Sequence, residues 1–116
     1  MTRMLPILML VSGCAHNWDR QDTMLFAAYA TAATADAYTT TKIQYDDNLT
    51  EQNPVARLIL GDNPSTASTW QTAAILLTCN YLIARAMPET WRKRYLITWT
   101  AGHSIATINN CNHGLC

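Results

Sequence analysis

The stretch Gln21–Gln44, QDTMLFAAYATAATADAYTTTKIQ, is rich in Ala and Thr and contains neither Pro nor Gly. Its larger side chains recur at helical spacing, as Leu25, Tyr29 and Asp36 do, so the pattern predicts one long helix. The many small residues would let a neighbouring helix approach closely. We therefore expect a fold of closely packed helices.

Two further long helices are predicted in the second half of the chain. The first covers residues 64–87 and ends before Pro88, which cannot continue a helix. Its apolar residues keep helical spacing: Trp70, Ala74, Leu77, Tyr81 and Ala84. The second starts at Glu89, whose negative charge suits a helix N-terminus, and runs to about residue 109. One face of this last helix carries four apolar residues: Ile97, Ala101, Ile105 and Ile108.

Residues 45–65, between the first two long helices, form the irregular centre of the sequence. The Asp-Asp-Asn run at 46–48 is a turn signal, because these side chains bond their own backbone. The Asn-Pro pairs at 53–54 and 63–64 each place an N-cap residue before a Pro at the first helical position. Gly61 suits the left-handed conformation that ends a helix, which predicts a short helix over 54–60. No strand-like alternation is present, so the predicted fold is all-α, a compact bundle of three main helices and one short helix.

The composition of the 116-residue chain lies between that of soluble and membrane-spanning proteins. Hydrophobic residues make up 49% of the chain and charged residues 14%, whereas about 25% charged is usual in soluble proteins. The mean hydropathy of −0.05 is equally low for a chain of membrane spans. The formal net charge is zero, so the bulk electrostatics do not point to a nucleic-acid partner.

The first residues of the chain have the three parts of a secretory signal. Arg3 precedes the apolar run 5–11, and the small residues Ser12 and Gly13 come directly before Cys14. This arrangement resembles the lipobox of bacterial lipoproteins. The resemblance implies cleavage after Gly13, diacylation of the Cys14 sulfur, and a chain tethered to a membrane by its new N-terminus. The alternative is an intact cytosolic start whose apolar run packs into a core, with Cys14 an ordinary thiol.

Under the lipoprotein interpretation the chain has four parts: a signal peptide over 1–13, a tether over 14–20, a helical bundle over 21–110 and a C-terminal tail over 111–116. The covalent lipid on Cys14 is the one attached group expected, and no cofactor is expected. Ala15 after the cysteine resembles the signal that sends such lipoproteins to the outer membrane. The expected location is therefore the periplasmic face of the outer membrane, with membrane lipid as partner and an envelope protein as a further partner.

A multi-pass inner-membrane protein is the competing interpretation. The basic cluster between Arg85 and Arg94 should face the cytoplasm, which places the start of the first long helix in the cytoplasm too if all three helices cross. A lipidated Cys14 lies on the exported side, so the two interpretations exclude each other. Each crossing would also place a costly side chain in the membrane, such as Asp36 or Arg85.

Three cysteines remain beyond the signal region. An exported chain enters an oxidising compartment, and Cys111 and Cys116 enclose four residues. We predict a short terminal disulfide between these two, with Cys79 left as a buried thiol. Three reduced, structural thiols are the alternative.

Five polar residues form the candidate site: Asp36, Thr40, Glu51, Asn53 and His103. An acid and threonines late in one helix, followed by Glu-x-Asn-Pro in the next loop, resemble a family of small bacterial and phage-borne membrane proteins of uncharacterised function. The resemblance covers roughly residues 20–110 and implies no activity. Carboxylates and an imidazole are suited to a hard-metal site or an acid/base pair. Alternatively the acids bond helix ends or hydroxyls, and the histidine is a core side chain.

The sequence contains no Cys-x-x-Cys pair, no His-Glu-x-x-His motif and no nucleophile elbow, so no catalytic or metal-ligating residue is assigned. Trp91, Tyr95 and Trp99 fall on one stripe of the last helix beside the basic run 92–94. Such a stripe suits either a membrane surface or the bundle core.

Together these features predict a non-enzymatic, membrane-tethered lipoprotein whose helical bundle contacts lipid or an envelope protein. The alternative is a three-span membrane protein. Its buried Asp36, Glu51 and His103 would bind an ion or a lipid headgroup, or perform hydrolysis.

Overall fold

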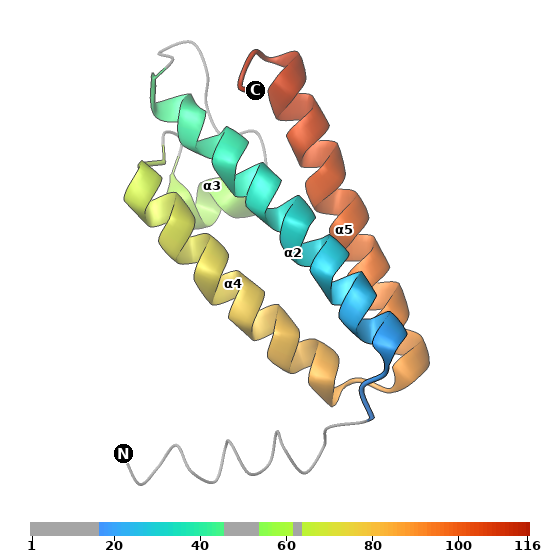
Figure 1. Ribbon diagram of the computed structural model, residues 1–116. Coiled ribbons are helices and arrows are strands. Elements are labelled where there is room, and N and C mark those ends of the chain that lie inside the picture. Colours follow the sequence, from blue (N-terminus) through green and yellow to red (C-terminus); the bar gives the residue numbers. More distant parts are fainter. Residues whose placement is uncertain (1–16, 46–53, 62–63) are drawn as a thin grey trace, which may run out of the picture.

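The computed structural model describes residues 17–45, 54–61 and 64–116 (Figure 1). Its elements in chain order are α2 (Arg20–Thr40), the 3-10 turn η1 (Thr41–Tyr45), α3 (Pro54–Leu60), α4 (Thr66–Ala86) and α5 (Glu89–Asn112). All regular structure in these residues is helical, which confirms the predicted all-α bundle of three long helices and one short helix.

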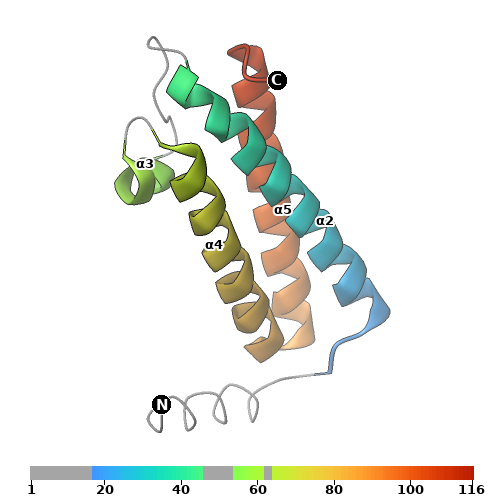
Figure 2. The ribbon, with the colours of Figure 1, turned by 60° about the vertical axis from the view of Figure 1, so that its left-hand side comes forward.

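The three long helices lie side by side, and α3 lies beside the start of α4 (Figures 1 and 2). α2 and α5 run in the same direction and α4 runs opposite to both. Of the helix pairs, α2 and α5 share the most extensive contact. The start of α2 therefore lies at the same end of the bundle as the turn between α4 and α5. The C-terminus lies at the opposite end.

α2 begins with a reciprocal capping box. The Asp22 backbone N–H donates to the N-cap Asp19 side chain at 2.8 Å, and the Asp19 backbone N–H donates to the Asp22 side chain at 3.0 Å. Two backbone donors at the helix start are thus satisfied by two carboxylates. The helix starts one residue before the predicted Gln21 and ends at Thr40, where the chain tightens into η1.

The short helix α3 has the predicted bounds, and Gly61 ends it in the left-handed region with φ +83°. The Gly61 N–H donates to the Arg57 carbonyl at 2.8 Å. The predicted start of the next helix was wrong. α4 begins at Thr66 behind the N-cap Ser65, whose hydroxyl accepts from the Ser68 N–H at 3.2 Å. The serine hydroxyl supplies the acceptor that the helix start requires, and Pro64 lies buried before this cap.

α5 extends three residues beyond the predicted end, so the first two residues of the predicted tail are helical. The chain then closes in a Schellman motif. Gly114 has φ +82° and its N–H donates to the Cys111 carbonyl at 3.0 Å, while the Leu115 N–H donates to the Asn110 carbonyl at 3.0 Å. Leu115 is buried, so the end of the chain is packed rather than free.

The core is small and lies where the three long helices meet. Tyr29, Ala84 and Leu96 form its centre. Partly buried hydrophobic residues pack around them: Trp18, Leu25, Phe26, Ala33, Leu77 and Tyr95. The face of α5 that carries the isoleucines points outward, since Ile105 is 68% exposed and Ile97 and Ile108 are also exposed. Within the described residues, no helix combines the length and apolarity that a membrane crossing requires.

Candidate functional site

The structure brings three of the five candidate residues together between α2 and α5. Nδ1 of His103 lies 2.7 Å from Oδ2 of Asp36, and the Thr40 hydroxyl donates to Oδ1 of Asp36 at 3.4 Å. Asn110 donates to the Thr39 hydroxyl at 2.8 Å and reaches Oδ1 of Asp36 at 3.5 Å. We call the bonded residues the Asp36 cluster: Asp36, Thr39, Thr40, His103 and Asn110. Glu51 and Asn53 lie outside the described residues.

Helical spacing explains this convergence. Asp36 and Thr40 are one turn apart on α2, and His103 and Asn110 are two turns apart on α5, so each pair shares one helix face. Because α2 and α5 run parallel and in contact, the two faces meet. Thr39 and Asn110 were not predicted from the sequence. The seven-residue spacing from His103 to Asn110 is the one signal that could have indicated the second of these.

Two aromatic rings pack against the histidine of the Asp36 cluster. The His103 imidazole stacks on Trp99, with ring centroids 5.7 Å apart and an interplanar angle of 28°, and its centroid lies 5.7 Å from that of Tyr29. The hydroxyls are used locally: Thr40 donates to the carboxylate, and Thr39 donates to the backbone of its own helix. Within the part of the chain that the structure describes, no three His, Cys, Asp or Glu side chains gather as metal ligands.

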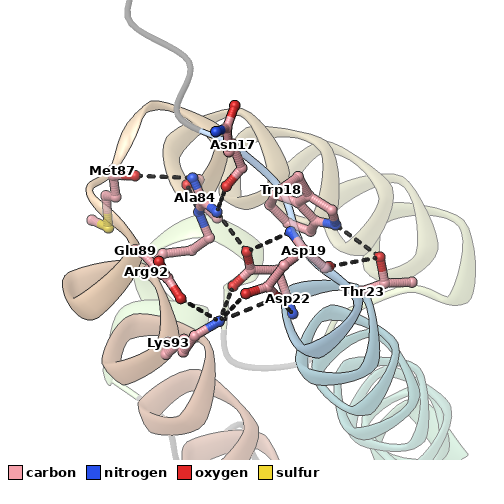
Figure 3. Close-up of polar contacts among 10 residues, drawn as sticks. All are labelled: Asn17, Trp18, Asp19, Asp22, Thr23, Ala84, Met87, Glu89, Arg92 and Lys93. Carbon is pink, nitrogen blue, oxygen red and sulfur yellow. Dashed lines mark hydrogen bonds and ion pairs between the residues drawn. The ribbon is translucent and has the colours of Figure 1, made fainter.

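A second polar group, the Arg92 network, lies at the end of the bundle where α2 begins (Figure 3). Nη1 of Arg92 lies 2.6 Å from Oδ2 of Asp22, and both side chains are fully buried. The guanidinium also donates to the backbone carbonyls of Ala84, Met87 and Asn17, at 2.8, 3.1 and 2.6 Å. One side chain therefore ties the end of α4, the α4–α5 turn and the segment before α2 together.

Lys93 completes the Arg92 network. Its ammonium lies 2.9 Å from Asp22, 3.1 Å from Asp19 and 3.6 Å from Glu89. Burial alone would raise the pKa of Asp22, but hydrogen bonds from the Asp19 backbone, Lys93 and Arg92 outweigh it and lower that pKa from 3.8 to about 2. The backbone hydrogen bond from Asp22, together with Lys93, lowers the pKa of Asp19. The hydrogen bonds of the Lys93 ammonium with Asp22 and Asp19 raise the pKa of Lys93.

Residues 92–94 form one basic run in the sequence, but their side chains have different surroundings in the structure. Arg92 is fully buried, Lys93 is paired, and Arg94 is exposed with its guanidinium 5.6 Å from the centre of the Trp91 ring. The aromatic stripe divides in the same way: Trp91 is 62% exposed, whereas Tyr95 packs against the core. Neither the membrane-surface nor the core interpretation therefore describes the whole stripe.

Asn80 links the three long helices through two tyrosines. It donates to the Tyr29 hydroxyl at 2.8 Å and accepts from the Tyr95 hydroxyl. Burial raises the pKa of both tyrosines, so both hydroxyls keep their protons at neutral pH. Every buried side-chain nitrogen or oxygen of the described residues has a hydrogen-bond partner.

The cysteines beyond the signal region differ from one another. Cys111 and Cys116 form a disulfide that closes the end of α5. Cys79, expected to be a buried thiol, is exposed, because α4 turns its Asn80 and Ala84 face to the bundle. Cys14 lies outside the described residues.

No protein-family model, curated protein or solved structure matches this chain.

Proposed function

We propose that this protein is a non-enzymatic lipoprotein, tethered to a membrane through a lipid on Cys14, whose helical bundle contacts lipid or an envelope protein. The observation that carries the proposal is the order of residues at the start of the chain. A single basic residue, an apolar run and two small residues lead directly to a cysteine, and each of these parts has a place in the export and acylation of a lipoprotein. Two or more acyl chains are enough for stable attachment.

The described bundle supports a structural rather than a catalytic role. The polar side chains of the Asp36 cluster and the Arg92 network are bonded to one another or to the backbone. Groups used in this way tie helices together. The bundle also exposes large apolar side chains along α4 and α5, such as Ile75, Leu82 and Ile105, and such surfaces are typical of sites that contact lipid or protein.

A second candidate function is favoured by the contact between Asp36 and His103. A carboxylate that holds an imidazole can act as an acid/base pair or supply ligands to an ion, and the two side chains remain 17% and 21% exposed. Under this second proposal the chain is a multi-pass protein that binds an ion or a lipid headgroup at the Asp36 cluster, or performs hydrolysis there. Asp36→Ala would then abolish ligand binding or activity.

Labelling with palmitate in cells tests the lipoprotein proposal. We expect label in the parent chain and none in Cys14→Ser. Cys79→Ser is the matched control, since Cys79 is an exposed thiol that nonspecific acylation would reach, and we expect it to keep the label. Equal labelling of the parent and Cys14→Ser would contradict the proposal.

A further inference from the structure

We infer that one end of the bundle contacts the membrane, namely the end formed by the start of α2, the end of α4 and the start of α5. Trp91 lies in the interfacial layer of the membrane. Arg20, Arg85 and Arg94 contact anionic lipid headgroups. We call this end the anchor-proximal end. The inference rests on the proposed lipid on Cys14 and adds which surface meets the membrane and which lipid it selects.

Covalent geometry places this end near the membrane. Three residue steps separate Cys14 from Asn17, and an extended chain spans about 3.5 Å per residue, so Asn17 lies within roughly 10 Å of the lipidated residue. Asn17 itself accepts a hydrogen bond from Arg92 at 2.6 Å. The first described residue is therefore bonded to the start of α5, which keeps the anchor-proximal end close to the tether.

Large side chains are exposed at this end within five residues of a helix terminus. Met24 in α2, Ile83 in α4 and Trp91 in α5 are exposed. Tryptophan is favoured at membrane interfaces because its ring is apolar and its N–H is polar. The guanidinium of Arg94 lies 5.6 Å from the centre of the Trp91 ring, and that of Arg85 lies 5.3 Å from the centre of the Trp18 ring. Aromatic rings and cations therefore lie together at this end.

The charge at this end suits an anionic surface. It holds five basic residues and three acidic ones, an excess of two positive charges. Arg92 and Lys93 pair with the carboxylates of Asp19, Asp22 and Glu89. The other three basic residues, Arg20, Arg85 and Arg94, supply the excess. Basic groups close to an anionic leaflet are attracted to it within about one Debye length.

The sides of the bundle fit a charged membrane surface less well. The remaining parts of α4 and α5, residues 66–84 and 95–112, contain no Asp, Glu, Lys or Arg. Apolar side chains such as Ile105 are exposed there, but no cation accompanies them. A side-on contact would therefore lack both the charge and the closeness to the tether, and it is one outcome of the test below.

The test uses the full chain after processing in cells, reconstituted in vesicles of phosphatidylcholine with phosphatidylglycerol. Brominated lipids quench tryptophan fluorescence on contact. We expect Trp91→Phe to remove most of this quenching and Trp70→Phe, at the start of α4, to preserve it. Both side chains are partly exposed, so neither change should unfold the bundle.

The lipid selectivity is tested with the quencher itself. Brominated phosphatidylglycerol should quench more strongly than brominated phosphatidylcholine, since each arginine favours anionic lipid by about fivefold. Arg20→Gln with Arg94→Gln should strongly reduce the difference, because only Arg85 of the three arginines then remains, and Arg57→Gln on α3 should retain it.

The outcomes separate this inference from the proposed anchor. A lipid-modified chain in which Trp70→Phe removes as much quenching as Trp91→Phe overturns the end-on contact alone. A chain whose two brominated lipids quench equally overturns the lipid selectivity. An unmodified mass for the purified chain overturns the anchor and the end-on contact together.

Discussion

The guanidinium of Arg92 and the carboxylate of Asp22 lie 2.6 Å apart, with both side chains fully buried, and join the start of α5 to the start of α2. Seventy positions separate the two residues in the sequence. Since Arg92 also bonds three backbone carbonyls, the charge has a partner for most of its donors. A buried charge in this state is tolerated, whereas the same charge without its partner is not.

Arg92→Met should therefore lower the free energy of unfolding by about 3 kcal/mol, the lower end of the range for breaking a buried pair, because Lys93 still contacts Asp22. Chemical denaturation measures the change. Arg94→Met is the control, since Arg94 is exposed and its replacement should change stability by at most about 0.5 kcal/mol. If both variants lost the same free energy of unfolding, the buried pair would contribute no more to stability than an exposed arginine does.

The stability of the bundle should fall in acid. The pKa of Asp22 is about 2 in the folded chain, whereas an aspartate without these partners has a pKa of 3.8. The unfolded chain therefore binds the proton more readily. The contribution of Asp22 is therefore complete above about pH 5 and is lost as the pH falls from about 4 to 2. Unfolding measured across this range should show the loss. Asp22→Asn should make the fall shallower, and an unchanged slope would contradict the account.

The Asp36 cluster should act as a tie between α2 and α5. Asp36→Ala removes a hydrogen bond to a charged group and should lower the free energy of unfolding by about 1.5–3 kcal/mol. Asp36→Asn keeps an acceptor for His103 and should cost less. If Asp36→Ala leaves unfolding unchanged but abolishes binding of an ion or headgroup, the second candidate function replaces the structural role.

The terminal disulfide should have a modest effect. Cys111 and Cys116 are five positions apart, and closing so short a loop limits the entropic stabilisation to about 2 kcal/mol. Reduction should add the mass of two hydrogens and lower the free energy of unfolding by at most about 2 kcal/mol. Cys79→Ser should retain both the oxidised mass and the free energy of unfolding. Unfolding of the whole bundle on reduction would contradict this modest effect.

Local chemistry predicted the helices well. Pro88 and Gly61 mark helix ends that depend only on the backbone of their own neighbourhood, and the helical spacing of Tyr29 and Asp36 predicted one long helix, which the structure shows as α2. The start of α4 was misplaced because Ser65 competes with the preceding Asn-Pro pair as a cap, and both are acceptable N-cap sequences.

Long-range pairing was harder to predict. Asp36 and His103 were grouped by residue type, but Asn110 and the Asp22–Arg92 pair depend on how α2 and α5 meet. The inward face of α5 was not predicted either. Apolar residues occur all around this helix, so its isoleucines did not reveal an inward face, and the inward side holds Arg92, Leu96 and His103 instead.

The lipoprotein proposal requires that Cys14 carry lipid and become the first residue of the mature chain. The decisive measurement is the intact mass of the chain purified from the membrane fraction, determined beside that of Cys14→Ser. We predict that the parent has lost the first 13 of its 116 residues and gained acyl groups, and that Cys14→Ser retains those residues without acyl groups. A parent chain that retains residues 1–13 and carries no lipid would contradict the account.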